Sequence, residues 1–205
     1  MRKSIPSLMW LIMVLILISS CSSSDKNNQA GNEGNRNQIP AASSDGQANM
    51  AGGLDWEAPA SWKVGPPQQM RVVTYLISPV EGDADNAELA VFHFPGTGGA
   101  KDANLQRWEG QFEQPDGRNS ADVAVIKEIE TNGLKVTTID LSGTYKVTGG
   151  PMMEVKDKKP DYRLIGAIIE GPQGMVFFKM TGPEKTVAAS ENDFMRMVRS
   201  AKSGT

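Results

Sequence analysis

The chain has 205 residues, with 21 basic and 24 acidic side chains, a formal net charge of −3, one cysteine and one histidine. Its modest acidity argues against a nucleic-acid partner, and a single cysteine excludes an intrachain disulfide. One histidine and one cysteine are also too few ligands for a zinc site of the usual kind, unless a partner supplies the others, and we expect no metal or cofactor.

Residues 1–20 have the pattern of a signal peptide. Arg2 and Lys3 precede an apolar run of 11 residues, Leu8 to Ile18, and a membrane-spanning helix would need about 20. The segment Ile18-Ser19-Ser20-Cys21 resembles the lipobox of bacterial lipoproteins. That resemblance implies that the cysteine thiol receives a diacylglycerol, that residues 1–20 are removed, and that the new N-terminus is acylated by a fatty acid such as palmitate. The alternative is an ordinary secretory signal that ends in a cysteine by chance.

The lipobox implies a bacterial envelope protein that is attached to a membrane through its lipid, with its domain facing the periplasm. Ser22, in place of aspartate, resembles the sorting preference of enteric outer-membrane lipoproteins, so the outer membrane is favoured if the host is Gram-negative. Residues 21–53 are rich in Ser, Asn, Gln and Gly, a composition that predicts a disordered tether. Residues 54–205 then form one globular domain.

Within that domain, strands are predicted first. Met70 to Ile77 is rich in β-branched and aromatic residues between prolines, and Glu88 to Phe94 alternates in side-chain direction, with His93 on the face of Leu89 and Val91.

A helix is predicted next, with Asp102 as its N-cap. Leu105, Trp108 and Phe112 follow at helical spacing, and the turn at 115–117 would end the helix.

Two hairpins follow. Asn132-Gly133, a strong hairpin signal, separates strands at 122–131 and 134–142. A second pair, 162–170 and 175–181, flanks the turn at 171–174.

A C-terminal helix begins near Glu184, with a break near Ser190. The predicted class is therefore α+β, with a single antiparallel sheet packed with helices.

The order of these elements resembles PsbP-like domains. The resemblance rests on the Pro/Trp segment Trp56–Trp62, the hydrophobic hairpin of 165–171 and 175–182, and the helix of 194–200. It implies a PsbP-like architecture and a non-catalytic accessory or binding module. The Gly98-Gly99, Arg107-Trp108 and Gln111-Phe112 pairs also resemble uncharacterised bacterial lipoproteins, which imply no activity.

Two motifs suggest chemistry without completing it. The glycine-rich segment Gly96 to Lys101 lies between a strand and a helix, as phosphate-binding loops do, but Asp102 follows its lysine and the P-loop spacing is absent. A plain turn is favoured. His93 could act as the base of a hydrolase, but no Gly-x-Ser-x-Gly nucleophile motif accompanies it. A packed or surface histidine is favoured.

Other polar and aromatic groups have similarly plain interpretations. Asp83, Asp85 and Glu88 suggest calcium through their oxygen ligands, but lack the full loop pattern and are better explained as a solvated loop. The aromatic residues Trp56, Trp62, Trp108 and Phe112 could line a groove, but a core position is favoured. The segment 156–159 is expected to be a solvated charged turn.

These observations favour a lipid-anchored envelope protein that is not an enzyme, whose domain binds an unknown protein or small molecule. A hydrolase that uses His93 is the alternative, and a purely structural envelope protein is a third possibility.

Overall fold

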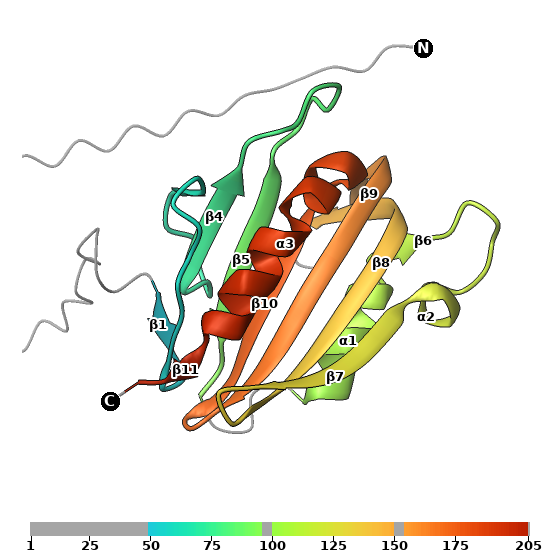
Figure 1. The fold of residues 1–205 in the computed structure, drawn as a ribbon. Helices are drawn as coiled ribbons and strands as arrows, with labels where there is room; N and C mark the ends of the chain where they lie inside the picture. Colours follow the sequence, from blue (N-terminus) through green and yellow to red (C-terminus); the bar gives the residue numbers. More distant parts are fainter. Residues whose placement is uncertain (1–48, 96–99, 150–153, 205) are drawn as a thin grey trace, which may run out of the picture. The chain divides into compact units, whose positions relative to one another are not determined.

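The computed structural model describes residues 49–95, 100–149 and 154–204 (Figure 1). Its elements are, in chain order, β1 (Met50–Ala51), β2 (Leu54–Asp55), β3 (Lys63–Val64), β4 (Val73–Ile77), β5 (Ala87–His93), α1 (Lys101–Glu109), β6 (Phe112–Glu113), α2 (Ser120–Val123), β7 (Val125–Thr131), β8 (Leu134–Gly149), β9 (Glu154–Gly171), β10 (Gly174–Pro183), α3 (Glu184–Ser200) and β11 (Lys202–Ser203).

The strands of the described residues form two antiparallel sheets. The larger has eight strands in the order β3-β4-β5-β10-β9-β8-β6, with β7 also paired to β8, and the smaller has the order β1-β2-β11. The α+β class is confirmed, but the prediction of a single sheet is wrong. The small sheet consists of two-residue strands, which are too short to carry a periodic sequence signal.

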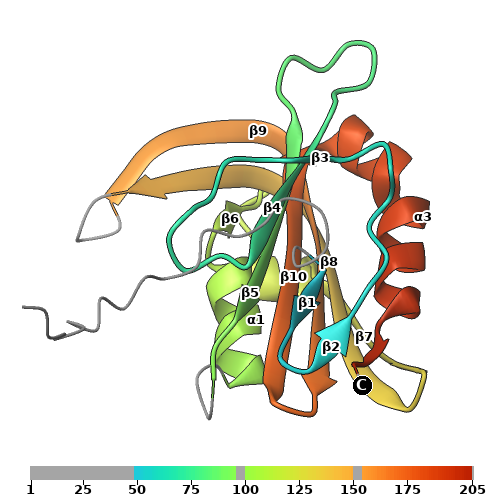
Figure 2. The same ribbon diagram turned by 90° about the vertical axis from the view of Figure 1, so that its left-hand side faces the viewer.

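The two faces of the large sheet hold separate cores. Leu89, Val91 and Phe178 pack with α3 on one face, whereas Ile139, Leu164 and other side chains pack with α1 on the opposite face. Figure 2 shows the sheet nearly edge-on, with α3 on one side and α1 on the other. The alternation predicted for residues 88–94 is confirmed.

Both predicted hairpins are confirmed. Asn132 and Gly133 have φ of 49° and 76°, which the type I′ turn requires at both central positions, and Thr131 pairs with Leu134. In the second hairpin Gly171 pairs with Gly174. Two predicted strands begin later than expected. Residues 120–123 form the unpredicted helix α2, and β4 begins only at Val73.

The strands β8 and β9 extend well beyond their predicted ends. Residues 156–159, predicted as a charged turn, lie within β9 and pair with β8. A register irregularity lies between Gly143 and Tyr145, opposite Pro160 and Asp161, and another between Val147 and Thr148. Such bulges accommodate proline and bend a strand. Figure 2 accordingly shows β8 and β9 curving away from α3, over the side that α1 occupies.

The helices differ from prediction in their ends. Ala100 is the N-cap of α1, and Asp102 lies in the first turn without a capping hydrogen bond. The helix ends at Glu109, so Phe112 belongs to β6, although it is buried with Trp108 as expected. The C-terminal helix α3 continues through Ser190 without the predicted break.

The folded part of the chain includes residues that the sequence assigns to the tether. Asn49 accepts a hydrogen bond from the Tyr75 hydroxyl, and its carbonyl accepts one from the backbone N–H of Trp56 (3.1 Å). The indole N–H of Trp56 in turn donates to the Tyr75 oxygen (3.1 Å). Residues 49–53, with strand β1, are therefore held against the domain.

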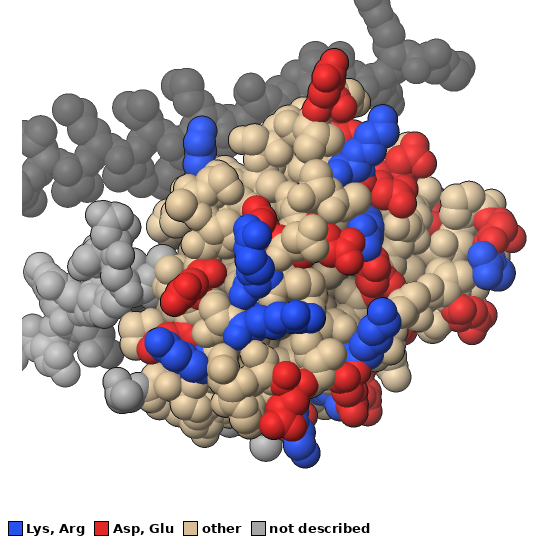
Figure 3. All heavy atoms as spheres, viewed as in Figure 1, with Lys and Arg blue, Asp and Glu red and all other residues tan. Residues whose placement is uncertain are grey.

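None of the helices in the described ranges is both long and apolar enough to cross a membrane. On the face that α3 covers, lysine and arginine alternate with acidic side chains (Figure 3). The contacts of Arg163 with Asp140 (2.7 Å) and Glu191 (2.9 Å) illustrate this mixing.

Candidate functional site

A pocket of about 290 Å³ lies on the side of the large sheet opposite α3. Its floor comes from β5 and β10, and its wall comes from the curved parts of β8 and β9. We call it the cation–aromatic pocket. It is lined by Arg71, Asn86, Glu88, Ala90, Phe92, Tyr145, Val147, Lys159, Tyr162, Lys179 and Thr181.

Each of its three basic side chains lies over an aromatic ring. The Arg71 guanidinium is 5.7 Å from the centre of the Phe92 ring. The Lys159 ammonium is 5.5 Å from the ring of Tyr162, and the Lys179 ammonium is 5.2 Å from that of Tyr145. Such contacts stabilise a cation through the negative ring face.

The two tyrosines connect the Lys159 and Lys179 contacts. The rings of Tyr145 and Tyr162 stack with centres 6.0 Å apart and planes 6° apart, and Phe112 packs on Tyr145 at 5.3 Å. Burial raises the pKa of both tyrosine hydroxyls, so both stay neutral.

Two of the cations have carboxylate partners. Nη1 of Arg71 donates to Oε1 of Glu88 (2.6 Å) and to Oγ1 of Thr74 (3.1 Å). Nζ of Lys159 donates to Oδ2 of Asp85 (2.5 Å). The hydrogen bond from Lys159 holds the pKa of Asp85 below its usual range.

The third cation, Lys179, has no carboxylate within ion-pair distance among the described residues. Its Nζ donates to the neutral Oε1 of Gln111 (2.6 Å). Burial, the largest cause, acts together with the positive charges of Arg71 and Arg107, against the opposing effect of Glu88, to lower the pKa of Lys179 to about 7. The site thus holds a lysine that is poised between its charged and neutral forms near neutral pH.

A second group in this pocket is also unsatisfied. The Thr181 hydroxyl is buried and has no hydrogen-bond partner in the described protein. It lies two residues beyond Lys179 on β10, on the same side of the sheet. Buried polar atoms without partners are uncommon, and each calls for an explanation such as a ligand or an ordered water.

The electrostatic character of the pocket follows from its lining. Three basic residues and one acidic residue, Glu88, line it, although the chain as a whole is acidic. Such an arrangement favours an anion over a cation. The clearest sequence signal for it is Lys179 itself, a lysine inside the otherwise apolar strand segment 175–180.

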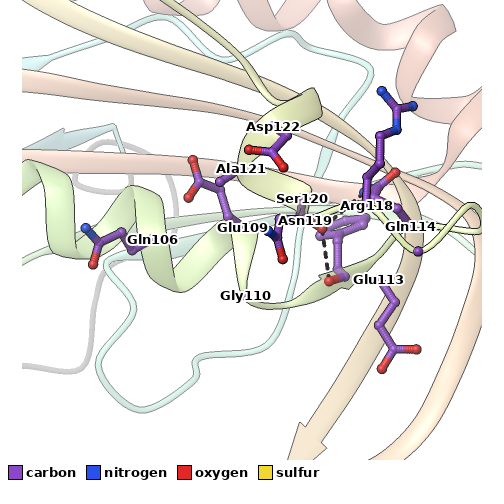
Figure 4. Close-up of a pocket in the computed structure, with 12 residues that line it drawn as sticks. Gln106, Glu109, Gly110, Glu113, Gln114, Arg118, Asn119, Ser120, Ala121 and Asp122 are labelled. Carbon is purple, nitrogen blue, oxygen red and sulfur yellow. Dashed lines mark hydrogen bonds between the residues drawn. The ribbon is translucent and has the colours of Figure 1, made fainter.

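A larger and shallower depression of about 640 Å³ lies between α1, β6 and α2 (Figure 4). Its central polar groups bond within the protein, because Ser120 donates to the Phe112 carbonyl (3.0 Å) and accepts from Gln114 (3.1 Å). In Figure 4 the side chain of Glu113 points away from Glu109. No group of three or more potential metal ligands occurs in the described ranges.

His93 lies on β5 outside the cation–aromatic pocket. Its Nδ1 is 3.2 Å from the carbonyl oxygen of Met175. A catalytic triad would place a serine and a carboxylate against the two ring nitrogens, whereas the partner here is a backbone carbonyl.

The three carboxylates of the suggested calcium loop serve separate contacts. Asp83 accepts hydrogen bonds from the backbone N–H (2.9 Å) and the hydroxyl (2.6 Å) of Thr186, in the first turn of α3. Asp85 binds Lys159 and Glu88 binds Arg71. The structure therefore does not bring them together as ligands of one ion.

The remaining sequence candidates are placed as follows. Cys21 and positions 96–99 of the glycine-rich segment lie outside the described residues. Lys101, at the end of that segment, pairs with Glu128 at 2.9 Å. The aromatic residues suggested as groove or core are buried, namely Trp56, Trp62, Trp108 and Phe112.

No protein-family model and no curated protein sequence matches the chain. Solved structures similar to it include LpqN of Mycobacterium tuberculosis, involved in cell envelope biogenesis (7% identity, TM-score 0.44, 73% of this chain and 82% of that one). They also include PsbP of the cyanobacterium Synechocystis (13%, 0.43, 80% and 97%) and PA94 of Pseudomonas aeruginosa, of unknown function (12%, 0.40, 68% and 95%). At these values the similarity establishes nothing about the site.

Proposed function

We propose that this protein is a lipid-anchored component of the bacterial envelope whose domain binds a small ligand without transforming it. The observation that carries the binding part is the cation–aromatic pocket. It combines a concave surface, convergent polar groups and a perturbed lysine pKa, the combination expected of a ligand site.

Binding is favoured over catalysis by the contacts that the polar groups make. The cations of the pocket rest on aromatic rings, and His93, on which a hydrolase would depend, faces a backbone carbonyl elsewhere. A general base must lie within hydrogen-bond reach of the proton that it removes. The described residues offer no such pair of nucleophile and base at His93.

Attachment through Cys21 is supported by the lipobox alone. Two or three acyl chains give stable membrane anchoring, because each buried methylene contributes about 0.8 kcal/mol. The domain would then face the periplasm, and in a Gram-negative host Ser22 favours the outer membrane.

The anchor is tested with Cys21→Ala in the native host. We expect the wild type to fractionate with membranes, to resist extraction by high salt, and to show the mass of an acylated N-terminus. The variant should lose the lipid and remain uncleaved at this site. An unmodified Cys21 in purified membranes would refute the anchor.

The pocket is tested by nuclear magnetic resonance on the chain from residue 21 with Cys21→Ser, which keeps every described residue. A fragment set of neutral, anionic and cationic compounds is added, and amide shifts are followed. We expect binders to shift Tyr145, Lys179 and Thr181. Tyr162→Ala should weaken these binders, because it removes one wall of the pocket. If no compound shifts these residues, binding at this pocket is refuted.

A further inference from the structure

We infer that the ligand of the cation–aromatic pocket carries an anionic group, a carboxylate or a phosphate, that binds the ammonium of Lys179 and the guanidinium of Arg71. This inference rests on the proposed binding function and names the chemistry of its ligand.

The first support is the incomplete environment of Lys179. An ammonium has three N–H donors, and Gln111 accepts one of them at 2.6 Å. None of the carboxylates in the described residues pairs with it. A partly buried cation without a counter-ion is unfavourable, and an anion in the pocket would supply both the charge and the acceptors.

The second support is that some N–H donors of the Arg71 guanidinium lack an acceptor among the described residues. Both of its hydrogen bonds within the described protein, to Glu88 and Thr74, leave from the same nitrogen, Nη1. The Nε and Nη2 donors of this guanidinium have no acceptor among the described residues. Since a guanidinium offers five N–H donors in a planar fork, Arg71 can keep Glu88 and still bind a ligand oxygen.

Strand pairing places the two cations close to each other. Lys179 on β10 pairs with Ala90 on β5, and Thr181 pairs with Glu88, the partner of Arg71. The charge of Arg71 is close enough to lower the pKa of Lys179. An anion bound at both would relieve this repulsion, and the Thr181 hydroxyl lies beside the same position.

Other ligand classes fit less well. A metal cation would meet three basic side chains and one carboxylate. A neutral sugar that stacks on aromatic rings would find Tyr145 already covered by Lys179, Tyr162 and Phe112. The volume of about 290 Å³ lies at the lower end of ligand pockets, which suits a body of about monosaccharide size.

Binding of such an anion depends on pH. The charged groups around Lys179 are Arg71 before β4, Glu88 on β5 and Arg107 on α1, and the Tyr145 ring of β8 contacts its ammonium. On the neighbouring strand β9, Lys159 is paired with Asp85. Since burial lowers the Lys179 pKa to about 7, anion affinity should fall as the pH rises above that value.

The test measures the affinity of the chain from residue 21 with Cys21→Ser for named probes. Glucuronate and glucose 6-phosphate carry the two anionic groups on a sugar, glucose is the neutral control, and inorganic phosphate tests the anion alone. Vesicles of phosphatidylglycerol, compared with phosphatidylcholine, test whether the anion belongs to a lipid headgroup. We expect at least one anionic probe to shift Lys179 and Thr181, and glucose to leave them unchanged.

Substitutions of Lys179 and Arg71 test whether these two cations bind the anion. Lys179→Met and Arg71→Gln should each weaken the anionic probe about tenfold or more, the loss expected for a charge-assisted hydrogen bond. The matched control is Lys158→Met, which removes a lysine paired with Glu113 outside the pocket, and it should change affinity less than about twofold. Binding should also raise the Lys179 pKa, followed through its side-chain nitrogen resonance.

The outcomes separate this inference from the proposed function. If neutral or cationic fragments shift the pocket residues and the anionic probes do not, the pocket binds a ligand and the anion is refuted. If anions bind equally well to wild type, Lys179→Met and Arg71→Gln, the inference is also refuted. Anion binding that needs Lys179 and falls between about pH 6 and pH 9 supports it.

Discussion

Replacing Lys179 by methionine should remove a pH dependence of folding that this one residue creates. In the folded protein burial lowers its pKa from 10.5 to about 7, whereas in the unfolded chain the group keeps its ordinary value. Between these two values the unfolded state binds more protons than the folded state. The stability of the wild type therefore rises with pH in this window, and the unfavourable burial of the charge is fully present below about pH 7.

The magnitude follows from the size of the pKa difference. One pKa unit corresponds to about 1.4 kcal/mol. From about pH 6 to about pH 9 the wild type should gain roughly 2 to 3 kcal/mol relative to Lys179→Met, which has no proton to lose. The variant also loses the hydrogen bond to Gln111 and the contact with Tyr145, so the absolute difference at one pH is less informative than its slope.

The assay is urea unfolding of both proteins at several pH values across this range, without any anionic probe. The other titrating groups are shared, so their effects cancel in the difference between the two proteins. Lys158→Met is the control, because its exposed lysine pairs with Glu113, and its difference from the wild type should be flat over the range. A Lys179→Met difference that is equally flat would refute a partly buried ammonium that lacks a carboxylate partner.

Four further changes test the fold and the other sites. Trp108→Ala should destabilise the domain by about 3 to 5 kcal/mol in urea unfolding, because the side chain is buried against the sheet; a loss below about 1 kcal/mol would place it outside the core. Deleting the chain through Gly53 should lower the urea midpoint relative to a deletion that ends at residue 48, since it removes Met50 and Ala51, which pair with β2; equal midpoints would contradict this. Asp83→Ala should cost about 1 kcal/mol and lower thermal stability, as loss of a helix cap does, and Asp83→Asn should recover part of it. His93→Gln should leave anion binding unchanged and alter stability by no more than about 3 kcal/mol; an ester, amide or phosphoester turnover that disappears in this variant would establish a hydrolase instead.

The elements that could be predicted from the sequence are those with a strong local signal. The turn at Asn132-Gly133 requires positive φ at two positions and therefore specifies its hairpin. The alternation in β5 likewise specifies which side chains face each core. By contrast, the small sheet depends on Lys202 and Ser203 returning to pair with Leu54 and Asp55, a long-range contact that leaves no local pattern.

The candidate site could not be predicted from the sequence for a related reason. Its residues come from segments that are distant in the chain, and Lys159 lies where polar composition predicts a turn, although it pairs with Tyr145 within β9, next to the bulge at Pro160 and Asp161. Lys179 carried a signal in its apolar strand, but the sequence alone does not show that it lacks a carboxylate. The sequence also gives no sign of the role of Gly166, where an added side chain would meet Trp108 at 2.5 Å.

The small sheet has a consequence for how the chain could be reconnected. β1 and β11 both pair with β2, one on each side, so the first and last strands of the described chain lie two strand spacings apart, about 10 Å. A short linker from residue 204 to residue 49 would therefore span them and allow circular permutation, in which new termini are opened at an exposed loop. Because the cation–aromatic pocket takes no residue from β1, β2 or β11, a permuted protein would have its termini at a new place and keep the pocket lining intact.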